Sequence, residues 1–274
     1  MRTVDHHGRR TAYRVLGEDP DDGIDADRSG DAEQPPDSDV PGVLCVHGSG
    51  ATGELWVGLS RLADRASVAA LDLSGHGDSD DVDAAPGPET LEAYAADVVA
   101  VAEATDASVL VGNSLGGAVA MWVALERDLE IDGLVLAGTG AKLTVLDDLL
   151  VWLREDFERA VEFLHEADRL FHDADDATLS RSREAMREAG RATVERDFRT
   201  CHSFDVRDRL DEIDAPTLAI VGEHDGLTPP RYHEYLAAEI SDCSLRVLDD
   251  AAHLAMLERP VAFGDSVAEL LDRV

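Results

Sequence analysis

The chain has 274 residues, 44% of them hydrophobic, which suits one sizeable domain or a large core carrying an insertion. No apolar run approaches the roughly 20 residues of a membrane-spanning helix, and the N-terminus has no apolar stretch of the signal-peptide kind, so we expect a cytoplasmic protein with no membrane partner. The 58 acidic and 24 basic residues leave a formal net charge of -34, which argues against nucleic acid as a partner because its phosphates would meet a strongly negative field.

The first half of the chain alternates short apolar runs with segments of helical spacing. Residues 11–16 are predicted to form an early strand, whereas 18–40 are rich in Asp, Gly and Pro and predict an acidic surface loop. Further strands are predicted at 43–46, 67–72, 107–111 and 131–137, and helices at 54–66, 88–104 and 117–125. This repetition implies an α/β fold, a parallel sheet with helices on both faces.

The alternation breaks at residue 143. Residues 143–211 have a mostly helical, strongly charged pattern, whereas the runs at 217–221 and 244–248 resume the sheet and helices follow near 232–240 and at 260–271. The simplest account is an α/β core formed by 1–142 and 212–274 that carries a helical cap at 143–211. Such an insertion lies over the carboxyl ends of the strands, where open α/β sheets place their sites.

The most informative motif is a G-x-S-x-G sequence at residues 112–116, between a predicted strand and a predicted helix. A turn this sharp imposes strained dihedrals on its central residue, so Gly112 and Gly116 keep the space around Ser114 free of side chains. The turn exposes a serine hydroxyl above the sheet. Because chance produces this pattern often, the assignment of Ser114 as a nucleophile depends on partners elsewhere in the chain.

Two candidate partners follow the last two predicted strands. Taken alone, Asp225 is equally well a turn residue and His253 a surface or capping histidine. Serine needs a base to take its proton and an acid to orient that base, and the order Ser114, Asp225, His253 is the order used when such a triad is built on a sheet of this kind. The three residues together therefore predict a catalytic triad.

An oxyanion hole is predicted beside Ser114. One backbone donor is the amide of Leu115, the residue after the nucleophile, and the second is assigned to Ser49 in the loop after the strand at 43–46. Gly48 lets that loop approach a substrate closely.

With these motifs, the chain resembles the α/β-hydrolase fold superfamily. The resemblance covers nearly the whole length, except that the acidic loop is not included and the insertion resembles the superfamily only weakly. The segments that carry the resemblance are 47–50, 72–79, 112–117 and the pair 222–225 with 252–253. The resemblance implies a mostly parallel eight-stranded sheet under a helical cap, in the branch that holds esterases, enol-lactonases, cofactor-free perhydrolases and carbon-carbon bond hydrolases. Two positions depart from the usual pattern: Ala252 stands where glycine is usual, and Asn113 where histidine is frequent.

The function expected from these residues is hydrolysis of a small carboxylic ester or related acyl compound through an acyl-enzyme. We expect a small-molecule acyl substrate as the partner, and a monomer or small homo-oligomer. A perhydrolase or a carbon-carbon bond hydrolase or lyase with the same triad is the alternative, and a non-catalytic ligand-binding relative is a further one. The sequence contains no metal-ligand spacing and no dinucleotide fingerprint, so neither a metal nor a cofactor is expected.

The composition also resembles that of proteins from salt-in halophiles. Lys142 is the single lysine, aromatic residues make up 5%, and acidic residues are spread along the whole chain. Molar salt shortens the Debye length to about 3 Å and removes most of the self-repulsion of such a chain. We therefore expect adaptation to high salt.

Several other histidines, tryptophans and cysteines have structural interpretations, whereas His224 has no role that the sequence indicates. His76 is expected to support the loop at 72–79, and Trp56, Trp122 and Cys45 are expected to pack in the core. Three histidines of the predicted cap are expected to face solvent or pack within it: His165, His172 and His202.

Overall fold

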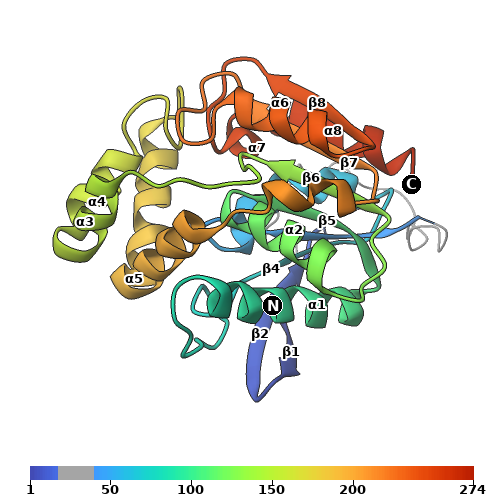
Figure 1. The fold of residues 1–274 in the computed structure, drawn as a ribbon, viewed down its shortest axis with the longest axis horizontal. Helices are drawn as coiled ribbons and strands as arrows, with labels where there is room; N and C mark the ends of the chain where they lie inside the picture. Colours follow the sequence, from blue (N-terminus) through green and yellow to red (C-terminus); the bar gives the residue numbers. More distant parts are fainter. Residues whose placement is uncertain (18–39) are drawn as a thin grey trace, which may run out of the picture.

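The computed structural model describes residues 1–17 and 40–274, so the predicted acidic loop lies, except for Val40, outside the described residues. The described residues form an eight-stranded sheet of order β1-β2-β4-β3-β5-β6-β7-β8, in which the β1–β2 and β2–β4 pairs are antiparallel and the remaining pairs are parallel (Figure 1). The strands are β1 Arg2–His6, β2 Arg9–Val15, β3 Gly42–Val46, β4 Val68–Leu71, β5 Ala107–Asn113, β6 Gly133–Ala137, β7 Thr217–Gly222 and β8 Cys243–Leu248. The predicted fold class is confirmed.

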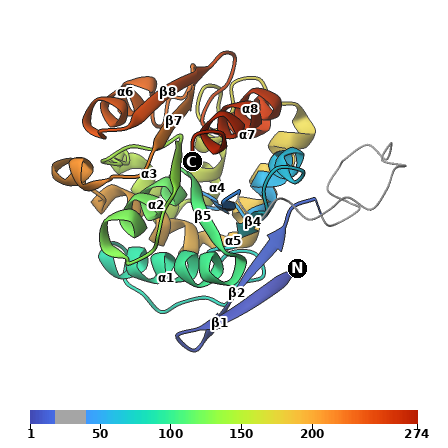
Figure 2. The same cartoon turned by 90° about the vertical axis from the view of Figure 1, so that its right-hand side faces the viewer.

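Helices cover both faces of the sheet, as Figure 2 shows for α1 and α2 on one side and α7 and α8 on the other. The helices outside the segment between β6 and β7 are α1 Pro88–Thr105, α2 Leu115–Glu126, α6 Pro230–Glu239, α7 Ala255–Glu258 and α8 Pro260–Leu271. Strand β3 shows why two cores form: Val43 and Cys45 join one apolar cluster, and Leu44 and Val46 join the other. Side chains alternate along a strand, and burial of both faces makes β3 apolar throughout.

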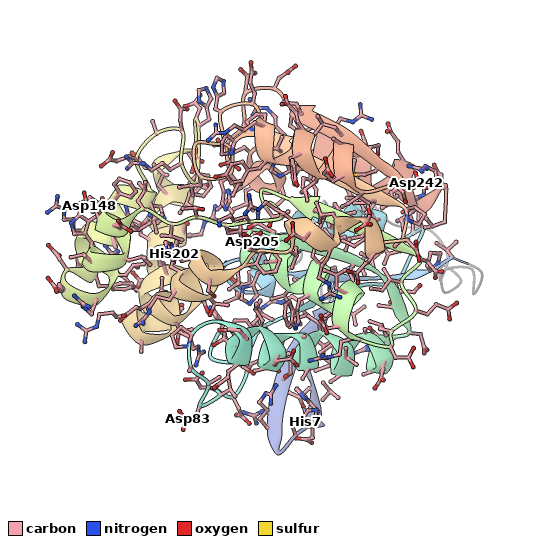
Figure 3. All side chains as sticks on the ribbon, in the orientation of Figure 1. His7, Asp83, Asp148, His202, Asp205 and Asp242 are labelled. Atoms are coloured by element: carbon pink, nitrogen blue, oxygen red, sulfur yellow. The ribbon has the colours of Figure 1, made fainter. Side chains whose placement is uncertain are left out.

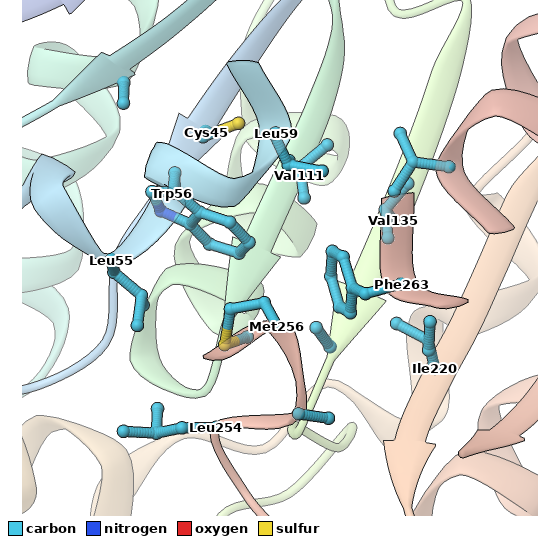
Figure 4. Close-up of a cluster of buried hydrophobic side chains, with 14 of the residues drawn as sticks. Cys45, Leu55, Trp56, Leu59, Val111, Val135, Ile220, Leu254, Met256 and Phe263 are labelled. Atoms are coloured by element: carbon cyan, nitrogen blue, oxygen red, sulfur yellow. The ribbon is translucent and has the colours of Figure 1, made fainter. Parts of the chain in front are cut away.

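Figure 4 shows the core on the α8 side of the sheet. Trp56 is fully buried there, with its ring centroid 6.0 Å from that of Phe263, and Cys45 is also fully buried. Trp122 is half-buried against the opposite core, and its indole N–H donates to Glu92 at 2.9 Å. The core assignments of Trp56 and Cys45 are thus confirmed, whereas Trp122 lies at the margin of its core.

One local prediction needs correction, and one strand has no counterpart among the predicted elements. The helix expected at 54–66 is a 3₁₀ helix, η1 Gly53–Leu62, in which Trp56, Leu59 and Leu62 are buried at intervals of three residues. That spacing matches three residues per turn, so one edge of a 3₁₀ helix faces the core. Strand β1 was not predicted, because an edge strand whose residues are mostly exposed carries little apolar signal.

The segment between β6 and β7 forms a group of helices to one side of the sheet (Figure 1). They are α3 Asp147–Glu155, α4 Phe157–Leu164, α5 Asp176–Ser203 and the short 3₁₀ helix η2 Arg207–Glu212. The helical character predicted for this segment agrees with these elements, and its boundaries as a separate cap domain remain a prediction. No helix within the described ranges combines the length and apolarity needed to cross a bilayer.

Candidate active site

A pocket of about 340 Å³ opens between the carboxyl ends of the central strands and helices α3 to α5. Ser49, Ser114 and His253 all line it, and so does Gly48. The rest of its wall is mainly apolar and comes largely from the segment between β6 and β7. The apolar side chains include Leu143, Val145, Leu149, Phe163, Leu170, Met186, Phe198, Leu227 and Leu254.

Ser114 occupies the turn between β5 and α2 with φ 54° and ψ -116°, a conformation that is rare for a residue with a Cβ. Its amide donates to the Ala137 carbonyl at 2.9 Å, which holds the turn against β6. A Cβ added to Gly112 would lie 2.6 Å from the Gly117 nitrogen, and one added to Gly116 would lie 2.6 Å from the His47 oxygen. Both glycines are thus required by close backbone contacts, which is the reason the sequence motif needs them.

His253 and Asp225 form a buried pair at the pocket wall. Nδ1 of His253 lies 2.9 Å from Oδ2 of Asp225, and the two side chains are 4% and 0% exposed. Burial by itself raises the pKa of Asp225, but the His253 ring and hydrogen bonds from Thr228 outweigh it and hold the pKa below its usual value. The bond engages Nδ1, so Nε2 is the ring nitrogen left for proton transfer.

Within residues 1–17 and 40–274, no hydrogen bond joins the Ser114 hydroxyl to His253, although both line the pocket. Such bonds are often long in the absence of substrate and tighten when it binds. The structure therefore brings Ser114, Asp225 and His253 to one pocket and connects two of them directly.

The amides of Leu115 and Ser49 both lack an acceptor among the described residues. Leu115 begins α2, where the first N–H groups of a helix have no partner within it. The loop of Ser49 approaches Ser114 closely, since a Cβ added to Gly48 would lie 3.1 Å from Cβ of Ser114. Two unpaired N–H groups thus flank the pocket near Ser114.

His47 holds this loop in place. Its Nδ1 lies 2.7 Å from the Gly48 carbonyl, and its Nε2 lies 3.0 Å from the Leu73 amide, which donates to it. This arrangement requires a neutral ring with the proton on Nδ1. Complete burial lowers the pKa of His47 to about 4, so the ring stays in that form near neutral pH.

The structure adds supporting residues that the sequence did not single out. Thr228 donates from its amide and its hydroxyl to Asp225, each at 2.8 Å, and its hydroxyl lies 3.2 Å from Nδ1 of His253. Thr139 donates its hydroxyl to the Ser114 carbonyl at 2.8 Å. An Asp followed three residues later by Thr is a turn-forming pattern, so the role of Thr228 could have been read locally. Nothing local indicates the role of Thr139.

The other histidines of interest lie away from the pocket lining in the described part of the chain. His76 is buried and bonds to Asp197 of α5 at 3.0 Å, which supports its structural interpretation. His165 is buried against Val161 and Ser182, and His202 is exposed. His172 is part-exposed and stacks on the ring of His224.

Known proteins resemble this chain over most of its length. A family model described as "Alpha/beta hydrolase family" matches residues 43–265. A pimeloyl-[acyl-carrier protein] methyl ester esterase of Neisseria meningitidis serogroup C is 30% identical over 250 residues, covering 86% of this chain and 95% of that protein. The structure of a thermophilic esterase has a TM-score of 0.80 at 27% identity, covering 99% of this chain and 97% of its own. The enol-lactonase from Burkholderia xenovorans has a TM-score of 0.82 at 22% identity, covering 99% and 100%, which shows a shared fold.

Proposed function

The chain belongs to the alpha/beta hydrolase family and is an enzyme of the carboxylic ester hydrolase type. We propose that it cleaves small esters and that Ser114 is its nucleophile. Asp225 and His253 are the acid and base of its triad. The observation that carries the proposal is the buried His253–Asp225 bond of 2.9 Å at the wall of the pocket that Ser114 also lines.

The reaction follows from these groups. Nε2 of His253 takes the hydroxyl proton as the oxygen of Ser114 attacks the ester carbonyl, and the amides of Leu115 and Ser49 donate to the oxyanion that forms. His253 then gives the proton to the departing alcohol. Water, deprotonated by the same ring, attacks the acyl-enzyme, and His253 returns that proton to the oxygen of Ser114 as the acid is released. Asp225 keeps the ring in the correct tautomer and stabilises its charged form.

The pocket supports an acyl group of modest size. Its volume of about 340 Å³ lies near the lower end for small-molecule sites, and its mainly apolar wall favours a hydrocarbon chain over a highly charged one. We propose that α3, α4 and α5 act as the cap that selects this chain. The name of the Neisseria relative makes methyl esters of medium-chain acids a sensible part of a substrate panel.

Comparison of Ser114→Ala with the wild type on a panel of esters tests the proposal. We expect turnover to fall by several orders of magnitude, up to about 10⁶, and labelling by a fluorophosphonate probe to disappear. Ser182→Ala is a matched control, because this serine also lines the pocket but its hydroxyl bonds to His165 at 2.9 Å. Near-normal turnover by Ser114→Ala would refute the mechanism.

The same panel separates the alternatives. Turnover of enol-lactones or dienoates without turnover of simple esters would favour the lactonase or carbon-carbon bond hydrolase chemistry. Failure of the probe to label the wild type would favour a ligand-binding relative without catalysis.

We propose further that the enzyme works in high salt. Exposed acids occur at widely separated parts of the surface, as Asp83, Asp148 and Asp242 illustrate in Figure 3. With a net charge of -34, the folded chain repels itself unless counterions screen it. Structure or activity should therefore be lost below about 0.5 M KCl, and an unchanged melting temperature in salt-free buffer would refute this.

A further inference from the structure

A second cluster of polar side chains lies outside the pocket, where the segment between α4 and α5 meets the loops that follow β7 and β8 (Figure 1). Asp168, His172 and His224 each offer a ligand atom there, and these atoms all lie within 4.8 Å of one another. We propose that they form a binding site for a divalent transition metal such as Zn²⁺, which would fasten the segment between α4 and α5 to the loop of Asp225.

The donor set favours zinc or a related metal over calcium or magnesium. Two imidazoles and one carboxylate are typical ligands of Zn²⁺, whereas Ca²⁺ and Mg²⁺ prefer oxygen donors alone. Glu223 lies next to His224, with a carboxylate oxygen 3.7 Å from its Nε2, but it is not one of the three donors that lie within 4.8 Å of one another. The net charge of -34 raises the local concentration of any cation.

The side chains are available for binding. Nδ1 of His172 lies 2.6 Å from Asp168, which leaves Nε2 of that ring without a hydrogen-bond partner among the described residues. Because Asp168 is itself a ligand of the proposed site, metal binding would replace its hydrogen bond to His172. Nδ1 of His224 likewise has no partner within the described ranges.

The two imidazoles stack with centroids 3.7 Å apart and planes 10° from parallel. The lone pair of a ring nitrogen lies in the plane of its ring, so the lone pairs of two stacked rings do not point at a common metal ion. One ring must therefore turn before both can bind the same ion. The side chains of His172 and His224 are 30% and 34% exposed, and an exposed ring can turn about χ2 without disturbing the core. Metal binding is therefore expected to break the stack.

The backbones that carry these ligands are fixed. The carbonyl of Asp168 accepts from Gly226 at 2.8 Å, and the amide of His224 donates to Ala251 at 2.9 Å. Glu258 accepts from the amide of His172 at 2.8 Å. Asp168 itself has φ 60°, an unusual conformation that these contacts maintain. Only side-chain rotation thus separates this arrangement from a metal site.

The cluster is coupled to the catalytic loops through the same segment. Its residues Arg169 and Leu170 accept backbone hydrogen bonds from His253 at 3.2 Å and from Leu254 at 2.9 Å. His224 immediately precedes Asp225 in the chain. A metal held here would stabilise the junction between the segment and both triad loops, without itself touching the substrate pocket.

Zinc binding to untagged full-length protein in molar KCl tests the proposal. Isothermal titration with Zn²⁺ should show saturable binding of one ion per chain, and Zn²⁺ should raise the melting temperature because it binds the folded state. Removing a ligand by His172→Gln or His224→Gln should weaken binding by about tenfold or more and abolish the thermal shift. Asp168→Asn should also weaken binding, and asparagine tolerates the positive φ at this position.

His7→Asn is the matched control, because His7 is an exposed histidine at the opposite end of the molecule (Figure 3) and also has a positive φ, of 48°. This variant should bind Zn²⁺ like the wild type. Co²⁺ gives a second readout, since a site with nitrogen ligands and low coordination number produces intense visible absorption that scattered carboxylates do not. Zinc binding that is absent from the wild type, or equal in the wild type and the three ligand variants, would overturn the proposal. Both readouts are independent of esterase activity, so failure here leaves the proposed function untouched.

Discussion

Gly116→Ala should disable the enzyme through geometry alone, since the substitution adds one methyl group and removes no functional atom. The added Cβ would lie 2.6 Å from the carbonyl oxygen of His47 and closer still to that of Val46. Both oxygens belong to backbone at the end of β3, which the neighbouring strands hold firmly. The start of α2 must therefore move instead.

The size of the movement follows from the distances. Ordinary contact begins at 3.4 Å, so the Cβ must retreat from the His47 oxygen by at least 0.8 Å, the difference between 3.4 and 2.6. Ser114 and Leu115 precede this position directly and move with it, away from the loop of Ser49. A misplacement of about 1 Å lowers catalysis by about 10²-fold, and overpacking of this kind destabilises by about 1 to 3 kcal/mol.

The assay is kcat/KM on an accepted ester in high salt, together with the free energy of unfolding. Gly133→Ala is the control, because the nearest atoms to a Cβ there are side-chain carbons of Leu270 and Val109 at 3.4 Å, an ordinary contact distance. It should change stability by less than about 1 kcal/mol and leave activity intact. If Gly116→Ala were folded and had wild-type kcat/KM, the argument that close packing sets the nucleophile would be refuted.

Three further perturbations probe the supports of the site. Thr228→Val removes the hydrogen bond of 2.8 Å that the Thr228 hydroxyl donates to Asp225. Steady-state kinetics should show kcat lowered by about tenfold with little change in KM. An unchanged kcat would contradict the positioning role of Thr228. Asp197→Asn removes the negative charge from a buried hydrogen-bonded pair of Asp197 and His76. A denaturant titration should show the free energy of unfolding lowered by about 3 kcal/mol. A change below about 0.5 kcal/mol would contradict this. Burial lowers the pKa of His233 to about 4, below the usual 6.5, so the unfolded chain binds the proton first and stability is lost as pH falls from 6.5 towards 4. The loss is about 2 kcal/mol at pH 5, and His233→Gln should show a correspondingly smaller fall between pH 7 and 5 than the wild type; equal falls would contradict the assignment.

Much of the fold was predictable because its signals are local. A buried strand such as β5 is a short apolar run, and the turn at Ser114 needs glycines within two residues on either side. Both features follow from the conformation of a few adjacent residues. Strand β1 escaped prediction for the converse reason, since its mostly exposed residues carry no apolar pattern.

The sequence also predicted that Ser114, Asp225 and His253 lie near one another. Each follows a strand, and the carboxyl ends of parallel strands meet at the same edge of the sheet. Their actual contacts were not. The 2.9 Å bond between His253 and Asp225 depends on how β7 and β8 are aligned, and the neutral state of His47 depends on its complete burial beside Leu73.

The sequence by itself thus determined the fold class and the identity of the candidate catalytic side chains. Only the tertiary structure decided that Thr228 and Thr139 support them and that His172 lies against His224, 52 positions further along the chain. The physical reason is that strand and turn preferences arise within a few residues, whereas contacts between distant segments depend on the packing of the whole sheet and the helices beside it.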